Sequence, residues 1–184
     1  MDKTYRTELF RTFLIEELPA PLTPASSHIQ IFDNYIANTR MRLRSIRVPE
    51  TKDWSRVLQH RFPVGDEGSF WKIAEMHLND TEYAQLQIFE GTEIRKNRYF
   101  REFDSRTFAF DVYLGTLWGV NRARVDFENG TELEGFPVPP FAAFEITNDP
   151  FFDDANLVHQ KFEDIREAVS KLTPASVSTV ALGQ

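Results

Sequence analysis

Apolar and polar residues alternate with a period of two along most of this chain, and clusters of Gly, Pro, Asn, Asp or Ser separate the alternating segments. Such alternation is typical of strands that bury one face, and the clusters are typical of turns. Many strands joined by short turns indicate an antiparallel meander or barrel. Eight segments alternate most clearly, namely 5–15, 29–37, 39–48, 55–62, 69–78, 93–103, 107–113 and 121–127, and 141–147 is a shorter ninth candidate.

Two other segments repeat their apolar residues at helical spacing. The first, 80–90, begins at an Asn79-Asp80 cap and ends before Gly91. The second, 154–172, carries an apolar stripe that we expect to pack against the sheet or the core. The stripe consists of Leu157, Phe162, Ile165, Val169 and Leu172.

The length and composition fit a globular, soluble protein. The chain has 184 residues, of which 41% are hydrophobic and 27% charged, and a chain of this length can bury one sizeable core. Seventeen Phe residues favour β structure, because aromatic side chains suit a pleated, half-buried surface. We therefore predict a mainly β fold of the α+β class, with one domain over residues 1–172 and a flexible tail over 173–184.

Charge and residue usage exclude several functional classes. The net charge is −7, with a pI of about 5.2, which argues against general nucleic-acid binding and against attachment to anionic lipid. The chain has no Cys, so disulfides, thiolate catalysis and Cys-ligated metals are excluded. Its four His residues lack close ligand spacing, and neither a phosphate-binding P-loop motif nor a dinucleotide-binding glycine motif is present.

The sequence gives no indication of a membrane association. Its first residues are polar and charged, and no stretch approaches the roughly 20 apolar residues that a membrane-spanning helix needs. We therefore expect a cytoplasmic protein. Nothing in the pattern predicts its oligomeric state.

The most informative feature is the placement of charges within the alternating segments. Side chains two residues apart share one face of a strand, so Arg42 and Arg44 lie together opposite Leu43. Lys96 and Arg98 repeat this arrangement. The segment 121–127 has a third basic-rich face, which carries Arg122 and Arg124. The acidic residues of these segments also lie on faces opposite largely apolar ones. The further charged residues in these patterns are Arg40, Glu8, Glu75, Asp111, Asp126 and Glu145.

Two interpretations of these faces remain open at this point. Each could be a solvated outer face with weak cross-strand ion pairs. In a closed barrel, however, the charged faces would converge inside, where guanidinium groups match the geometry of phosphate oxygens. We would then expect the basic side chains to repel one another in the empty barrel and to be relieved by a bound polyanion.

The order of these segments resembles the CYTH domain, or triphosphate tunnel metalloenzyme, superfamily. The family's opening Glu-x-Glu-x-Lys strand is similar to the segment 8–14, which keeps Glu8 but has Phe10 and Thr12 at the second Glu and the Lys. The most specific match is Ile94-Arg95-Lys96-Asn97-Arg98-Tyr99, which is similar to the family's Ile-x-Lys-x-Arg-Tyr strand.

Other segments extend the resemblance from about residue 7 to residue 168. Arg42-Leu43-Arg44 is similar to the family's Arg-x-Arg, and Arg61 keeps the charge of a family Lys. Asp111 lies in a segment that resembles the Ile-Asp-x-Phe-x-Gly strand. The segment Ala123-Arg124-Val125-Asp126 is similar to the family's Ala-Glu-x-Glu strand. It has Arg124 at the position of the first Glu, and the shorter Asp126 at the position of the second.

The resemblance implies an eight-stranded antiparallel β-barrel or tunnel with external helices, which agrees with the strand count above. It also implies a site in which basic residues bind a triphosphate while carboxylates hold Mg²⁺ or Mn²⁺ and orient a water molecule. The implied phosphate-binding residues are Arg42, Arg44, Arg61, Lys96, Arg98 and Arg124. The implied catalytic residues are Glu8, Glu75 and Asp111, and the implied metal ligands are Glu8, Asp126 and Glu145.

Two functions follow from the resemblance, and the sequence leaves both open. One is binding and metal-dependent hydrolysis of a triphosphate-bearing small molecule, such as inorganic triphosphate, thiamine triphosphate or a nucleotide. The alternative is a catalytically degenerate module of the same fold that binds phosphate or another polyanion. Nothing in the sequence specifies the organic group attached to the phosphates.

Overall fold

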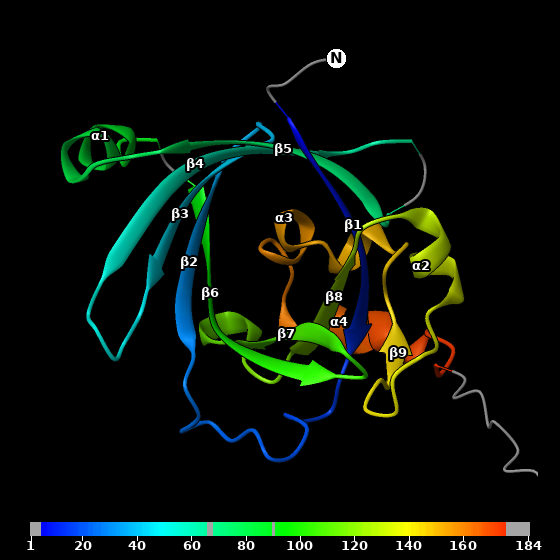
Figure 1. Cartoon of the computed structure of the whole chain (residues 1–184). Helices are drawn as coiled ribbons and strands as arrows, with labels where there is room; N and C mark the ends of the chain where they lie inside the picture. Colours follow the sequence, from blue (N-terminus) through cyan, green and yellow to red (C-terminus); the bar gives the residue numbers. More distant parts are fainter. Residues whose placement is uncertain (1–4, 66–67, 90, 176–184) are drawn as a thin grey trace, which may run out of the picture.

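The computed structural model describes residues 5–65, 68–89 and 91–175. Eight antiparallel strands form a closed barrel (Figure 1), in which β5 pairs with both β4 and β1 and so completes the ring. A short strand, β9, adds to the outer edge of β1. The strands are β1 (Arg6–Leu14), β2 (Ile29–Ile36), β3 (Met41–Arg47), β4 (Trp54–Pro63), β5 (Phe70–His77), β6 (Gly91–Phe103), β7 (Arg106–Tyr113), β8 (Asn121–Phe127) and β9 (Phe144–Glu145).

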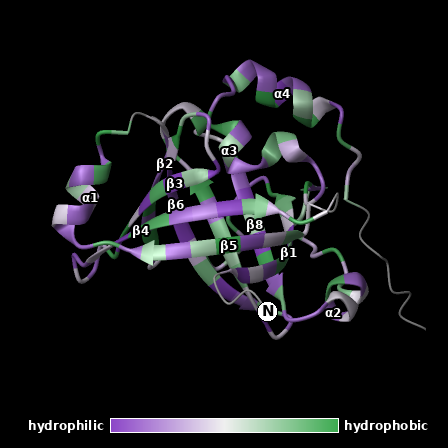
Figure 2. Ribbon diagram, turned by 90° about the horizontal axis from the view of Figure 1, so that it is seen from above, coloured by the Kyte–Doolittle hydropathy of each residue, from purple (hydrophilic) through white to green (hydrophobic). Residues whose placement is uncertain are grey.

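The barrel confirms the fold class that the alternating pattern predicted. Each of the eight main segments forms a strand, and the ninth candidate forms only the two residues of β9. Apolar and polar residues alternate visibly along the strands in Figure 2. The predicted tail falls largely on residues 176–184, which lie outside the described residues.

The helices differ more from the prediction than the strands do. The first, predicted over 80–90, is α1 (Asp80–Leu86), which has the expected Asn79 cap and, in addition, a capping box between Asn79 and Glu82. The predicted helix over 154–172 is two helices, α3 (Asp154–Leu157) and α4 (Phe162–Ser170). The chain turns between them, and α4 starts afresh because the Asp164 carboxylate accepts a hydrogen bond from the Lys161 backbone N–H.

Three shorter elements were not predicted. The α2 helix (Gly130–Gly135) is capped by Asn129, which accepts a hydrogen bond from the Glu132 backbone N–H. Two 3₁₀ turns, η1 (Gly115–Leu117) and η2 (Pro150–Phe152), connect larger elements. None of the helices among the described residues is long and apolar enough to cross a bilayer.

One hydrophobic core lies outside the barrel wall. The register pairs Phe13 with Ala123 and Phe110 with Ala123, so their side chains share the outer face of β1, β7 and β8. There they pack with the segment that follows α2. We call this cluster the outer core, and its buried members are Phe13, Ile15, Tyr99, Phe108, Phe110, Ala123, Val125, Phe127 and Ala142.

A second hydrophobic cluster closes one end of the barrel. It joins strand ends to η2, α3 and α4, and Figure 1 shows α3 within the outline of the ring of strands. Of the predicted helical stripe, Leu157 and Ile165 are buried here, whereas Phe162 is 46% exposed. We call this cluster the end core, and its buried members are Leu14, Ile94, Tyr113, Leu117, Val120, Ile146, Phe152, Leu157 and Ile165.

Candidate functional site

The barrel encloses a cavity of about 730 Å³. It lies on the face of the strands opposite to the outer core, and many charged side chains line it. Of the described residues that line it, nine are cationic and six are acidic. The cationic residues are Arg6, Arg40, Arg42, Arg44, Arg61, Lys96, Arg98, Arg122 and Arg124, and the acidic residues are Glu8, Glu75, Asp126, Asp149, Asp153 and Asp154.

Asp33 binds two of the three arginines of β3, Arg42 and Arg44. The register places Asp33 opposite Arg44 and Tyr35 opposite Arg42, which brings all four side chains to the inner face. Arg44 Nε and Nη2 donate to the two Asp33 oxygens at 2.6 and 2.7 Å, and Arg42 Nη1 lies 3.3 Å from Asp33 Oδ2. Burial alone would raise the pKa of Asp33, but the Arg42 and Arg44 guanidinium groups lower it to about 2. Asp33 is therefore a buried anion.

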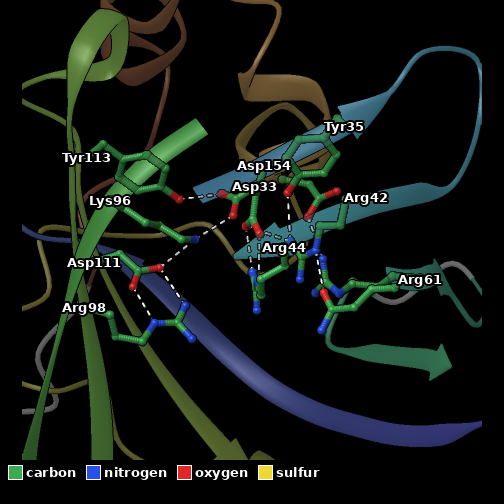
Figure 3. A network of polar contacts seen from close by, with 12 residues as sticks. Asp33, Tyr35, Arg42, Arg44, Arg61, Lys96, Arg98, Asp111, Tyr113 and Asp154 are labelled. Atoms are coloured by element: carbon green, nitrogen blue, oxygen red, sulfur yellow. Dashed lines mark hydrogen bonds and ion pairs between the residues drawn. The ribbon is translucent and has the colours of Figure 1, made fainter. Parts of the chain in front are cut away.

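Asp111 has the same role on β6 and β7 (Figure 3). Arg98 Nε and Nη2 donate to its two oxygens at 2.6 and 2.8 Å. Lys96 Nζ lies 2.9 Å from Asp111 Oδ2 and Arg122 Nη2 lies 3.4 Å from it. The guanidinium of Arg98 and the ammonium of Lys96 outweigh burial and hold the pKa of Asp111 well below its ordinary value. The sequence resemblance implied a catalytic role for Asp111, but the structure buries it behind the cations that it binds.

Asp154, at the start of α3, completes this network from outside the strands. Its carboxylate lies 2.7 Å from Lys96 Nζ and 2.9 Å from Arg122 Nη2, and it accepts a 2.5 Å hydrogen bond from the Tyr113 hydroxyl. Burial lowers the pKa of Lys96, and Asp111 and Asp154 oppose that effect. Lys96, which is 1% exposed, is thus held between two carboxylates.

Arg61 lies on β4 beside these networks and is less fully paired. Its guanidinium carbon lies 3.8 Å from the centre of the Trp71 ring, a cation–π geometry. Arg61 Nη1 donates to Asp153 Oδ1 at 3.1 Å, whereas its buried Nε has no hydrogen-bond partner among the described residues. The Arg61 guanidinium thus makes one hydrogen bond to the described residues, whereas those of Arg44 and Arg98 each make two.

The wall formed by β1 and β8 combines acids with an aromatic ring. The register places Phe10 opposite Asp126 and Thr12 opposite Arg124. Arg124 Nη2 lies 2.8 Å from Glu8 Oε2 and also contacts Asp126, so one guanidinium bridges two of the acids that the resemblance implied as metal ligands. Burial raises the pKa of Glu8, but Arg124 more than offsets it, and the net pKa is below its ordinary value.

The two remaining acidic candidates lie apart from each other. Glu75, on β5, lines the cavity and lies 3.3 Å from Arg6 Nη2. Glu145, on β9, pairs in register with Phe13, which places it with the outward-facing residues. Both of its carboxylate oxygens bind Arg11, at 2.8 and 2.6 Å.

The acids present do not fit the divalent metal site that the resemblance implied. Glu8 and Asp126 share Arg124, and Glu145 is bound by Arg11 outside the cavity. A cation this close would oppose metal binding. Within the described ranges, no group of three or more His, Asp or Glu side chains is arranged to hold a metal ion.

The electrostatics of the cavity also differ from the expectation of mutually repelling cations. Buried carboxylates compensate the basic side chains in the empty barrel, and two of these, Asp33 and Asp111, lie behind the cavity wall. The lining itself still has three more cations than acids. The cavity is therefore a fixed, mildly positive site in which donor groups are held ready by anions behind them.

Several site residues were not among the sequence candidates. The sequence pattern could have identified Asp33 as a site residue, because it is an acid on the same strand face as Ile31 and Tyr35. It could not have identified Asp153 or Asp154, because they belong to no strand and reach the cavity only through the path of the chain across the barrel end. Arg40 and Arg122 appeared in the charge pattern, and the structure adds both to the cavity wall.

Comparison with solved structures identifies the fold. No family model and no curated protein sequence matches the chain. The crystal structure of the inorganic triphosphatase NE1496 matches with a TM-score of 0.56 at 20% identity, covering 83% of this chain and 95% of that one. A second structure, of the hypothetical protein NE1496, matches with a TM-score of 0.57 at 20% identity, covering 84% and 99%.

A more distant match is HpAC1 from Hippeastrum, described as a putative adenylyl cyclase with a dominant triphosphatase activity. It has a TM-score of 0.40 at 11% identity and covers 70% of this chain and 83% of that one. The barrel closure, the strand order and the likeness to NE1496 agree with one another. The chain therefore has the CYTH-like fold of the triphosphate tunnel proteins, an eight-stranded closed antiparallel barrel.

Proposed function

We propose that this protein binds a small molecule carrying a triphosphate inside the barrel. The observation that carries this proposal is the gathering of nine cationic side chains around one cavity of about 730 Å³. A cavity of this size is within the usual range for small-ligand sites. Guanidinium groups suit the phosphate oxygens of such a ligand, because they offer several donors in a fixed plane.

The orientation of two arginines supports the proposal further. Asp33 and Asp111 each bind the Nε and Nη2 groups of one arginine, Arg44 and Arg98 respectively. The Nη1 groups of these arginines make no hydrogen bond to the described residues, and both side chains line the cavity. Donors held in place before binding cost little ordering free energy when the ligand arrives.

The likeness to NE1496 supports the class of ligand. One structure of that protein is described as an inorganic triphosphatase, and the barrel of this chain has the same fold. The basic residues implied by the sequence resemblance, Arg42, Arg44, Arg61, Lys96, Arg98 and Arg124, all line the cavity.

Between binding and hydrolysis, the ion pairs of the acids favour binding. Metal-dependent hydrolysis needs carboxylates that are free to coordinate Mg²⁺ or Mn²⁺. Here Arg124 bridges Glu8 and Asp126, and Glu75 contacts Arg6 and Gln59. We therefore propose a binding module and treat hydrolysis as the competing outcome.

Titration calorimetry with inorganic triphosphate, thiamine triphosphate and ATP tests the proposal, with and without Mg²⁺ or Mn²⁺. We expect binding in the absence of metal, loss of binding in Arg44→Ala, and retention of binding in Arg56→Ala. Arg56 is a suitable control because its register with Ser45 places it on the outer face of β4. No binding of any of the three compounds would reject the proposal, and release of phosphate by the wild type would establish an enzyme instead.

A further inference from the structure

Half of the acids that line the cavity come from one short segment outside the barrel strands. Asp149, Asp153 and Asp154 lie on or beside η2 and α3. The backbone of this segment is anchored in the end core by Phe152 and Leu157, which are 2% and 1% exposed. The segment therefore holds its carboxylates against the cationic wall at one end of the tunnel.

The adjacent acids Asp153 and Asp154 differ in how firmly they are bound. The Asp154 side chain is 5% exposed and contacts Lys96, Arg122 and Tyr113. The Asp153 side chain is 20% exposed, and its one ion pair among the described residues is with Arg61. Asp153 can therefore turn away by a side-chain rotation, whereas Asp154 cannot leave without exposing a buried network.

Arg61 is also the buried arginine whose charge is least compensated. Burial lowers its pKa, and the neighbouring cations Arg42 and Arg124 lower it further against the effect of Asp153. For Arg42 and Arg98, by contrast, nearby carboxylates outweigh burial and raise the pKa. Arg61 and Arg122 each have a buried Nε without a partner among the described residues, but Arg122 is paired with Asp111 and Asp154 whereas Arg61 is paired with Asp153 alone. Arg61 would therefore gain more than Arg122 from an anion with several charges.

We propose that Asp153 is an internal competitor that occupies Arg61 until the phosphates of the ligand take its place. This inference rests on the proposed function and names the side chain that exchanges partners on binding. Arg61 releases Asp153, which turns toward solvent, and donates to a phosphate oxygen. Asp154 keeps its contacts with Lys96 and Arg122 throughout. Asp153 thus lowers the affinity of the cavity for anions, and an anion with few charges does not displace it from Arg61.

Calorimetry with inorganic triphosphate at fixed pH and ionic strength tests this role. We expect Asp153→Asn to bind triphosphate about fivefold more tightly, the gain that corresponds to removing one partly exposed ion pair. Asp153→Ser serves as a second variant should the first fold poorly. The gain must disappear when Arg61 is replaced, so Arg61→Gln and Arg61→Gln/Asp153→Asn should bind equally.

Asp149→Asn is the matched control for charge alone. Asp149 lines the same end of the cavity and caps the Phe151 backbone N–H, a function that Asn retains. It makes no ion pair with the described residues, so its neutralisation should change affinity by less than about twofold. Equal gains in Asp149→Asn and Asp153→Asn would overturn the inference, as would weaker binding by Asp153→Asn or a gain that persists without Arg61.

The test also separates this inference from the proposed function. If the wild type binds triphosphate and Asp153→Asn binds no more tightly, the competitor role is wrong and the proposed function stands. If neither protein binds inorganic triphosphate, the competitor role is rejected, and the proposed function is rejected as well when thiamine triphosphate and ATP also fail to bind. Binding by Asp153→Asn alone would support the competitor role of Asp153 and would reject the proposed function for the wild type.

Discussion

The guanidinium carbon of Arg124 lies 4.0 Å from the centre of the Phe10 ring, on the inner faces of two adjacent strands. In the family that the sequence resembles, both positions carry a carboxylate. Here they carry a cation and an aromatic ring that stabilise each other. One contact therefore couples the two positions at which this chain departs from the family's pattern, and it places a cation where the resemblance would place a carboxylate.

This coupling predicts that anion binding does not depend on metal. A chelator should leave the affinity of the wild type for inorganic triphosphate unchanged in calorimetry. The variant Phe10→Glu/Arg124→Glu places two further carboxylates beside Glu8 and Asp126, and its triphosphate binding should become dependent on Mg²⁺ or Mn²⁺. Loss of wild-type binding in the chelator would contradict the prediction.

The buried position of Asp33 predicts a large effect on stability. Asp33→Asn removes the anion shared by Arg42 and Arg44 and leaves two cations underpaired, which should cost about 3–5 kcal/mol of unfolding free energy. Asp126→Asn is the control, because the Asp126 side chain is 59% exposed and its ion pair contributes about 1 kcal/mol or less. Urea denaturation measures both, and equal losses would argue against the buried network.

The lowered pKa of Asp33 predicts a defined dependence on pH. Because its pKa falls from 3.8 to about 2 on folding, its stabilisation is complete above about pH 4 and is lost as the pH falls toward 2. The contribution at neutral pH is about 2 kcal/mol. An NMR titration of the side-chain carboxyl carbons should find Asp33 ionised well below pH 3.8, and titration at or above its ordinary pKa would count against the ion pairs described here.

Ligand linkage predicts a thermal shift that ionic strength does not explain. At about 100 times its Kd, a ligand stabilises the folded state by about 2.7 kcal/mol, which raises the Tm of a chain of this size by several degrees. Inorganic triphosphate should therefore raise the Tm more than sulfate at equal ionic strength. Arg44→Ala and Arg98→Ala should reduce that rise relative to their own unliganded Tm.

Sulfate is the necessary comparison in that experiment. Excluded anions stabilise many proteins without occupying a site. Equal shifts from triphosphate and sulfate, unaffected by either arginine substitution, would mean that the cavity is not an anion site.

The fold was predictable because the period-two pattern fixes which side chains share a face. That pattern placed Arg42 with Arg44, and Lys96 with Arg98, and the closed barrel turns these faces inward. Whether the charged faces pointed inward or outward depended on closure between β1 and β5. Closure is a contact between distant segments that local alternation cannot specify.

The site was less predictable, because its acids are placed by tertiary contacts. The resemblance implied that Glu145 is a metal ligand, yet its pairing opposite Phe13 places it on the outer face. Asp154 lies in what the sequence presents as one long helix, and the ion pairs with Lys96 and Arg122 hold that stretch at the barrel end. Neither the register of β9 nor the path of α3 is encoded in local periodicity.

The location of the outer core separates folding from recognition on opposite sides of the same strands. Phe108 and Val125 pack outside the wall, while Asp111 and Arg122 on the same two strands lie on the inner face and bind each other. Interior side chains can therefore be exchanged in charge-balanced pairs without removing the apolar contacts that hold the barrel closed. A scaffold of this kind can diversify in the compounds it accepts while its folding requirements stay constant.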